Sequence, residues 1–157
     1  YAAVPRLHDE EPFLRLDPAE IADVDAATTV SGIGEAGTPV APGDVEPIDL
    51  IVSGSVAVTA AGGRVGKGEG YSDLEFALLR AAGRVDDDTT TATTVHPIQV
   101  VEEAIPTDPH DVPMDLIVTP DGIVRDERRE KPDGIDWERL DDERIAEIPV
   151  LERLRPE

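Results

Sequence analysis

The chain has 157 residues, a length that suits one domain with a single sizeable core, and 39% of its residues are hydrophobic, which excludes a wholly disordered chain. It contains no cysteine, which excludes disulfides, thiolate metal sites and cysteine nucleophiles. The formal net charge of −21 repels nucleic acid and anionic membranes, and no apolar stretch reaches the roughly 20 residues that span a bilayer. We therefore expect a cytoplasmic protein with no nucleic-acid or membrane partner.

The first part of the chain predicts short elements. Because Tyr1 is not a Met and residues 2–4 read like the end of a strand, we expect an N-terminally truncated chain. Residues 13–16 form a second apolar group, and Asp17-Pro18 supplies an N-cap and a first-turn proline for a short helix. Residues 25–47 are rich in Gly, Pro, Thr and Ala, which predicts mostly loop or edge structure.

The middle of the chain predicts a buried strand followed by a helix. Residues 50–52 and 56–58 form an apolar run, interrupted by residues 53–55, that is typical of a parallel strand buried on both faces. From Ser72 to Gly83 apolar residues recur at three- and four-residue spacings, which predicts an amphipathic helix that ends at the glycine.

Further elements follow towards the C-terminus. Residues 91–96 are Thr-rich and β-branched and predict a strand, residues 98–103 a short helix, and residues 116–119 another buried strand. Alternation of buried strands and helices predicts a layered α/β sandwich. We expect one α/β domain over residues 1–125.

The remaining residues, 126–157, predict a charged C-terminal extension. Trp137, Leu140, Ile145 and Ile148 are spaced for one amphipathic helix packed against the body of the protein. A partly ordered tail is the alternative.

A glycine-rich turn precedes the predicted helix at Ser72. Glycine lacks Cβ, so such a turn lets its N–H groups converge on an anion, and the following helix adds its positive end. Asp73, in the first turn of that helix, would either cap it or hold a Mg²⁺ ion that bridges phosphates. A flexible hairpin is the alternative. The residues predicted to bind phosphate are Arg64, Gly66, Lys67, Gly68 and Gly70.

Lysine is scarce in this chain. Lys67 and Lys131 are the only lysines among 14 basic residues, against 35 acidic ones. This balance is typical of a salt-adapted, halophilic protein, and an acidic protein from an ordinary cell is the alternative. A chain with so few lysines that has one in the glycine-rich turn favours phosphate binding there.

Three segments carry a family resemblance. Residues 49–59, 64–73 and 109–119 resemble, in motif, order and separation, the 5-formyltetrahydrofolate cyclo-ligase (methenyltetrahydrofolate synthetase) family. The resemblance covers residues 40–125 well. The motifs Gly-Ser-Val-Ala-Val and Gly-Lys-Gly-Glu-Gly-Tyr are most similar to the methenyltetrahydrofolate synthetase domain-containing branch.

The resemblance implies a three-layer Rossmann-like sandwich with a mostly parallel sheet. It also implies ATP- and Mg²⁺-dependent ring closure: ATP phosphorylates the formyl oxygen of 5-formyltetrahydrofolate, a second folate nitrogen attacks, and phosphate leaves to give 5,10-methenyltetrahydrofolate. By the same resemblance, the turn with Arg64 and Lys67 would cradle the phosphates. Tyr71 would line the junction of nucleotide and folate, and Asp73 would lie at the metal.

Two segments depart from the family pattern. The family turn ends in Tyr-Tyr-Asp-Arg, whereas Ser72 and Leu74 replace an aromatic residue and an arginine here. The family's last strand ends in Thr-Glu, where this chain has Thr119-Pro120.

Histidines and aspartates outside the turn are further candidates. His110, in a proline-bounded loop, would bind substrate or relay a proton at the mouth of the site. Asp115 would either join it or simply start the next strand. His96 would face the cleft at a strand end or lie packed or exposed, and His8 is expected on the surface.

Two functions remain open from the sequence. The first is an ATP-dependent cyclo-ligase with Lys67, Tyr71 and His110 as catalytic residues, ATP and Mg²⁺ as cofactors, and a small-molecule folate as substrate. The second is a non-catalytic nucleotide- or partner-binding domain of the same fold. A monomer is expected, with a homodimer as the alternative.

Overall fold

The computed structural model describes residues 1–125 and 130–156, which form two compact units. Unit 1 comprises residues 1–46 together with the chain from residue 136 onward, and unit 2 comprises residues 47–135. The domain boundary predicted at residue 125 falls within unit 2 and stays a prediction. The charged start of the predicted extension, residues 126–129, lies outside the described residues.

Unit 1 contains a small antiparallel sheet in the order β1-β2-β3, with Phe13 paired to both Ala3 and Val40. The apolar groups predicted near the start of the chain are confirmed as β1 and β2. The elements of this part are β1 (Ala2–Ala3), η1 (Pro5–Leu7), β2 (Phe13–Arg15), α1 (Val24–Ala27), α2 (Gly32–Ala36), β3 (Thr38–Val40) and η2 (Pro42–Asp44).

Residues 17–47 differ from the prediction in two places. Asp17 caps a single turn, because its Oδ1 accepts from the Ala19 N–H at 2.9 Å, but the expected short helix does not continue. The segment expected to be loop or edge contains the short helices α1 and α2, and Asp23 caps the first of these through the N–H of Ala26.

The C-terminal part of unit 1 forms two short helices rather than one amphipathic helix. They are α4 (Asp142–Glu147) and α5 (Pro149–Leu154), and they follow η4 (Trp137–Arg139). Pro149 has no N–H and cannot continue α4, so the chain turns at Ile148. Ile145 and Ile148 are buried, as their spacing predicted.

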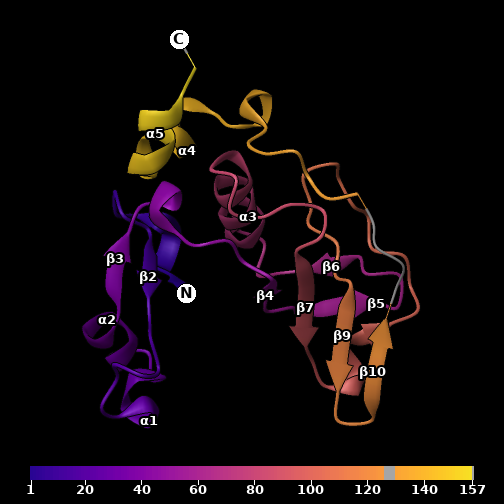
Figure 1. The fold of residues 1–157 in the computed structure, drawn as a ribbon. Coiled ribbons are helices and arrows are strands. Elements are labelled where there is room, and N and C mark those ends of the chain that lie inside the picture. Colours follow the sequence, from indigo (N-terminus) through magenta and orange to yellow (C-terminus); the bar gives the residue numbers. More distant parts are fainter. Residues whose placement is uncertain (126–129, 157) are drawn as a thin grey trace. The chain divides into compact units, whose positions relative to one another are not determined.

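Unit 2 contains a four-stranded mixed sheet in the order β10-β9-β7-β4. Three of its strands are parallel, and β10 returns antiparallel to β9 as a hairpin (Figure 1). The strands predicted at residues 91–96 and 116–119 are confirmed as β7 and β9. The strands are β4 (Leu50–Val52), β7 (Thr90–Thr94), β9 (Leu116–Thr119) and β10 (Gly122–Arg125).

A second sheet of unit 2 has the order β6-β5-β8, from β5 (Ala57–Thr59), β6 (Arg64–Val65) and β8 (Val100–Val101). The apolar run at 50–58 is therefore two strands in two sheets. Burial on both faces is wrong for β4, an edge strand in which Leu50 is 52% and Val52 61% exposed.

The helix predicted over residues 98–103 is also wrong. The segment forms a short 3₁₀ turn, η3 (Pro97–Gln99), and then β8, which pairs in parallel with β5. Strand pairing with a distant segment overrides the local pattern here.

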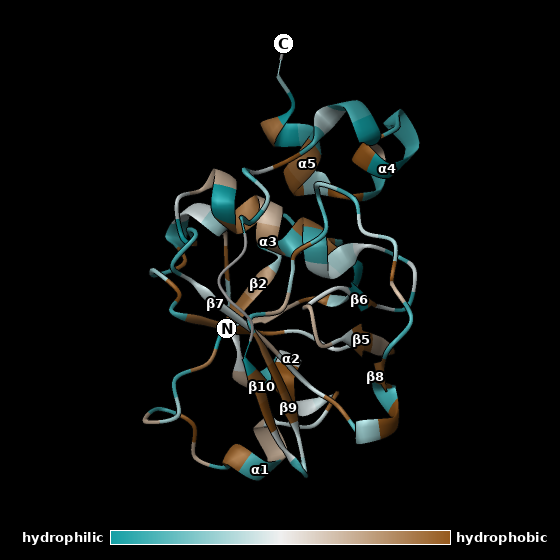
Figure 2. Ribbon diagram, turned by 90° about the vertical axis from the view of Figure 1, so that its right-hand side faces the viewer, coloured by the Kyte–Doolittle hydropathy of each residue, from teal (hydrophilic) through white to brown (hydrophobic). Residues whose placement is uncertain are grey.

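Helix α3 (Tyr71–Ala81) precedes β7 in the chain and confirms the amphipathic pattern. Its apolar side packs into the core of unit 2, and the hydrophobic colour in Figure 2 also marks β8 and β9. The buried apolar residues of unit 2 are Val58, Leu74, Phe76, Ala77, Leu78, Leu79, Val85, Ala92, Val95, Val112, Met114 and Ile117.

Lys131 lies within unit 2 with its side chain fully buried. Its Nζ donates to the Oδ2 of Asp115 at 2.9 Å and to the carbonyl of Thr89. Asp115 also accepts from the Thr91 N–H at 2.8 Å. Burial alone would raise the pKa of Asp115, but the hydrogen bonds from Lys131 and Thr91 outweigh it and hold the pKa below its ordinary value. Asp115 thus joins the sheet to the chain near residue 131.

The architecture is mixed α/β, as predicted. The finer expectation of a three-layer sandwich with a mostly parallel sheet stays a prediction. Among residues 1–125 and 130–156, no helix combines the length and the apolar character that crossing a bilayer requires.

Candidate phosphate-binding site

The glycine-rich turn connects β6 to α3 and ends at the helix N-cap. Gly68 and Gly70 have φ angles of 89° and 68°, which L-residues with a Cβ rarely adopt. A Cβ at either position would meet no atom within 4 Å. These glycines therefore serve backbone conformation rather than close packing, and the space beside the turn stays open.

A cavity of about 610 Å³ opens beside this turn, a volume within the usual range of small-molecule sites. Four chain segments of unit 2 line it: the β4–β5 loop, the turn, the first turn of α3, and the loop before β9. All eight site residues predicted from the sequence lie on its wall. They are Arg64, Gly66, Lys67, Gly68, Gly70, Tyr71, Asp73 and His110.

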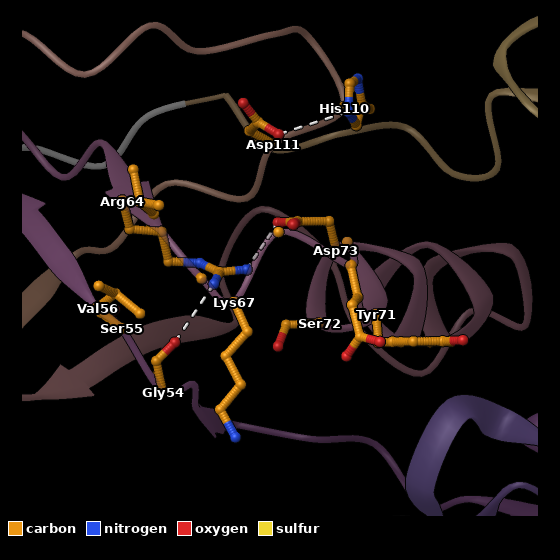
Figure 3. A pocket seen from close by; sticks show the side chains of 15 residues that line it. Gly54, Ser55, Val56, Arg64, Lys67, Tyr71, Ser72, Asp73, His110 and Asp111 are labelled. Carbon is orange, nitrogen blue, oxygen red and sulfur yellow. Dashed lines mark hydrogen bonds and ion pairs between the residues drawn. The ribbon is translucent and has the colours of Figure 1, made fainter.

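Arg64 and Asp73 form a buried ion pair in the cavity wall. The Nη2 of Arg64 lies 2.8 Å from the Oδ1 of Asp73, and the side chains are only 5% and 17% exposed. Arg64 also donates through Nη1 to the carbonyl of Gly54 at 3.4 Å, and Asp73 accepts from the Val112 N–H at 3.0 Å. Figure 3 shows Arg64 extended between Gly54 and Asp73.

Two buried nitrogens in this wall have no hydrogen-bond partner among the described residues: Nε of Arg64 and Nδ1 of His110. The other ring nitrogen of His110 lies 3.5 Å from Asp111. Asp111 in turn accepts from the Asp108 N–H at 2.7 Å, which orders the loop. Because buried polar atoms are usually paired, these two nitrogens mark a part of the wall that the described residues leave unsatisfied.

Lys67 is exposed in the centre of the turn and makes no hydrogen bond or ion pair within the described part of the chain. Its side chain extends away from the Arg64–Asp73 pair (Figure 3). Since Asp73 pairs with Arg64, Lys67 is the basic residue of the turn that makes no ion pair with a described carboxylate, although Glu69 lines the same cavity.

Glu75 lies two residues beyond Asp73 on α3. Burial raises the pKa of its carboxyl to about 7, against a lowering effect of Arg64 and with a smaller raising effect of Asp73. Its carboxyl accepts no hydrogen bond from the described residues. A carboxyl that is half neutral near pH 7 weakens the negative field beside the cavity.

The site suits an anion with several oxygens. It combines a helix N-terminus, a turn with open backbone, an exposed lysine and a buried arginine. In residues 1–125 and 130–156 no group of three or more His, Cys, Asp or Glu side chains could hold a metal. A Mg²⁺ ion bound mainly by phosphate oxygens needs only one or two carboxylates, and the second oxygen of Asp73 has no partner among the described residues.

Sequence reasoning missed the β4–β5 loop as part of the wall. Gly54, Ser55 and Val56 line the cavity, and Ser55 is held by a 2.8 Å hydrogen bond to Thr93 and by Gln99, which donates to its carbonyl. The interruption of an apolar run at the carboxyl end of a parallel strand was the available signal.

Three other candidates lie elsewhere. His96 is exposed and caps η3 by accepting from the Ile98 N–H, and His8 is 61% exposed beside Asp9. Asp115 is buried at the start of β9, where it binds Lys131.

Comparison with known proteins identifies the family of this chain. The family model described as 5-formyltetrahydrofolate cyclo-ligase family matches residues 3–120, which include every predicted site residue. The chain is 41% identical over 132 residues to the methenyltetrahydrofolate synthase domain-containing protein of Danio rerio. It is 42% and 40% identical to the proteins of the same name from Bos taurus and Homo sapiens.

These alignments cover 81–82% of this chain and 34% of each relative. The chain therefore spans about a third of the length of the curated relatives it matches.

Proposed function

Because the chain belongs to the 5-formyltetrahydrofolate cyclo-ligase family, we propose that its cavity binds ATP and a reduced folate and closes 5-formyltetrahydrofolate to 5,10-methenyltetrahydrofolate, with release of ADP and phosphate. One observation carries the proposal. The turn, the exposed lysine, the buried arginine and the histidine loop line a single cavity at the start of a helix.

Each residue has a chemical task in the proposed reaction. The N–H groups of Gly66, Gly68 and Gly70 and the ammonium of Lys67 hold phosphate oxygens, where charge increases during transfer. Arg64 lines the wall, where Asp73 holds its guanidinium. Little covalent help from the protein is needed, because positioning and charge stabilisation carry most phosphoryl transfer.

Tyr71, His110 and Asp73 complete the site in this proposal. Tyr71 lines the cavity beside the turn and packs where nucleotide and folate meet. His110 holds or relays a proton through Nδ1, which has no partner among the described residues. The unpaired oxygen of Asp73 would hold Mg²⁺, which neutralises phosphate charge when bound.

The finer fold prediction belongs to the same proposal. The parallel strands β4, β7 and β9 would form the centre of a three-layer Rossmann-like sandwich, with α3 on one face. A small-molecule folate substrate and a monomer complete it.

A second candidate is a non-catalytic nucleotide-binding domain. It is favoured by Leu74, which stands where the family pattern has an arginine and is buried in the core rather than exposed at the cavity. Ser72, in place of the second aromatic, offers no stacking surface.

The test mixes the chain with 5-formyltetrahydrofolate, ATP and Mg²⁺ in molar KCl and follows the methenyl product by absorbance. The cyclo-ligase proposal expects turnover that Lys67→Ala abolishes. Asp87→Ala, which removes a 66% exposed carboxylate outside the cavity, should leave turnover unchanged. ATP binding with no product supports the second candidate instead.

A further inference from the structure

The four segments that line the cavity come from different parts of the chain, so contacts between them must fix their relative positions. Side-chain bonds of Arg64 and Asp73 join all four of them. Arg64, at the start of the turn, reaches Gly54 in the β4–β5 loop and Asp73 in α3, and Asp73 reaches the N–H of Val112 in the loop after His110.

One oxygen atom, Oδ1 of Asp73, makes two of these three hydrogen bonds. The Oδ1 of Asp73 accepts from Arg64 at 2.8 Å and from Val112 at 3.0 Å, so one carboxylate fixes both the guanidinium and the backbone two residues beyond His110. Figure 3 shows Asp73 between Arg64 on one side and the His110–Asp111 loop on the other.

Burial distinguishes this pair from an ordinary surface ion pair. Exposed pairs hold side chains weakly, whereas a pair with 5% and 17% exposure exchanges its partners for water less readily. Removing the Asp73 carboxylate leaves Arg64 and the Val112 N–H without their shared acceptor, so the surrounding structure must rearrange. Such a pair adds little net stability but specifies one geometry.

We propose that Asp73 is a positioning residue, which acts through Arg64 and the Val112 N–H to hold the turn and the His110 loop at the distance that phosphate binding requires. The proposal rests on the proposed function for the identity of the ligand. It assigns to Asp73 a role that does not depend on any metal, because Oδ1 makes both bonds with groups of the chain itself.

The two roles of Asp73 separate when the metal is removed. A residue that acts only as a metal ligand does not affect the binding of ATP in EDTA. A positioning residue does, and asparagine should substitute for it because its side-chain oxygen can accept from both donors.

The experiment measures the affinity for ATP by calorimetry, in molar KCl with EDTA, for the wild-type chain, Asp73→Ala and Asp73→Asn. Hydrogen exchange of the Val112 amide is measured on the same proteins. We expect Asp73→Ala to weaken ATP binding at least about tenfold and to accelerate exchange at least about tenfold, since it removes the oxygen that accepts from both Arg64 and the Val112 N–H. We expect Asp73→Asn to stay within about threefold of the wild type in both.

Asp87→Ala is the matched control, because it removes the carboxylate partner of Arg80 at the other end of α3. It should change neither quantity. Circular dichroism melts identify a variant that fails to fold, and in that case the comparison of Asp73→Asn with the wild type decides.

The proposal is overturned if Asp73→Ala binds ATP as the wild type does in EDTA and loses affinity only with Mg²⁺. It is overturned equally if Asp73→Asn loses as much as Asp73→Ala. A wild-type chain that binds no ATP contradicts the proposed function, and the exchange of Val112 then decides the positioning role alone.

Discussion

Two regions of unit 2 contain the chain's only two lysines, and these lysines differ in burial and in hydrogen bonding. At the base of β9, Lys131 is fully buried and bonded to Asp115 and to the Thr89 carbonyl. At the cavity, Lys67 is exposed and makes no hydrogen bond or ion pair within the described residues. In the first region the lysine has its hydrogen-bond partners within the protein. In the second region the lysine is exposed and can contact a ligand.

The carboxyls of the two regions show the same contrast. The pKa of Asp115 is lowered, because hydrogen bonds from Lys131 and Thr91 outweigh the effect of burial. The pKa of Glu75 is raised to about 7, because burial is not balanced by a donor. Unsatisfied groups with shifted pKa values gather at functional sites, so the contrast indicates which region carries function and which carries stability.

The largest expected effect comes from breaking the satisfied region. Lys131→Met leaves the Asp115 carboxylate buried without its cation and should lower the free energy of unfolding by about 3–5 kcal/mol. Denaturant unfolding in molar KCl measures it. Lys67→Ala should change the same quantity by less than about 0.5 kcal/mol, because Lys67 is exposed.

Equal effects of the two lysine substitutions on the free energy of unfolding would contradict the contrast.

The pH dependence of the free energy of unfolding gives a second test of the buried pair. Since the folded-state pKa of Asp115 lies below its ordinary value, its contribution to stability is present above that value and is lost as pH falls through the folded pKa. Asp115→Asn should remove this part of the acid dependence.

A smaller effect is expected at Glu75. A raised folded-state pKa means that the folded protein holds a proton that the unfolded chain releases, so stability falls as pH rises from 4.5 to about 7. Glu75→Gln should remove that loss and raise the free energy of unfolding at pH 8 by about 1–3 kcal/mol. Unfolding curves at pH 4 and pH 8 measure it.

At pH 4 the carboxyl is protonated in both states, so Glu75→Gln and the wild type should differ little there. A gain of the same size at both pH values would show that Glu75 does not titrate as its burial implies.

The smallest expected effect on stability separates conformation from ligand contact. Gly70 and Gly83 lie at opposite ends of α3 with nearly the same φ, 68° and 69°, and a Cβ would meet no atom at either. Alanine at each position should cost about 1 kcal/mol of stability for the left-handed backbone. Only Gly70→Ala should also weaken ATP binding, because Gly70 lines the cavity.

Calorimetric titration with ATP compares the two variants. Loss of affinity in Gly83→Ala as large as in Gly70→Ala would mean that the turn has no specific part in binding.

How far the sequence predicts this molecule depends on how local each signal is. The helix α3 follows from the spacing of Leu74, Ala77 and Leu78, and β9 from a compact apolar run. Residues 98–103 were wrongly predicted as helix, because β8 exists only by pairing with β5, some 40 residues earlier in the chain.

The features of the candidate site also divide into those with a local sequence signal and those without one. The glycine-rich turn is a local signal, and the proline-bounded loop suggested His110 at the mouth of the site. The structure brings both to one cavity. The bonds from Arg64 to Gly54 and from Asp73 to Val112 join segments 10 and 39 residues apart, and no local pattern indicates them. The burial of Lys131 could not be predicted for the same reason. Lys131 follows a charged stretch of sequence, and its partner Asp115 lies 16 residues earlier in the chain.

The central claim is that the open turn around Lys67 binds phosphate oxygens, and calorimetric titration of ATP into the wild type and Lys67→Ala tests it most directly. The account predicts a measurable affinity in molar KCl that falls at least about tenfold in Lys67→Ala, while the free energy of unfolding stays unchanged. An affinity for ATP that is the same in both proteins, or absent from the wild type, would contradict it.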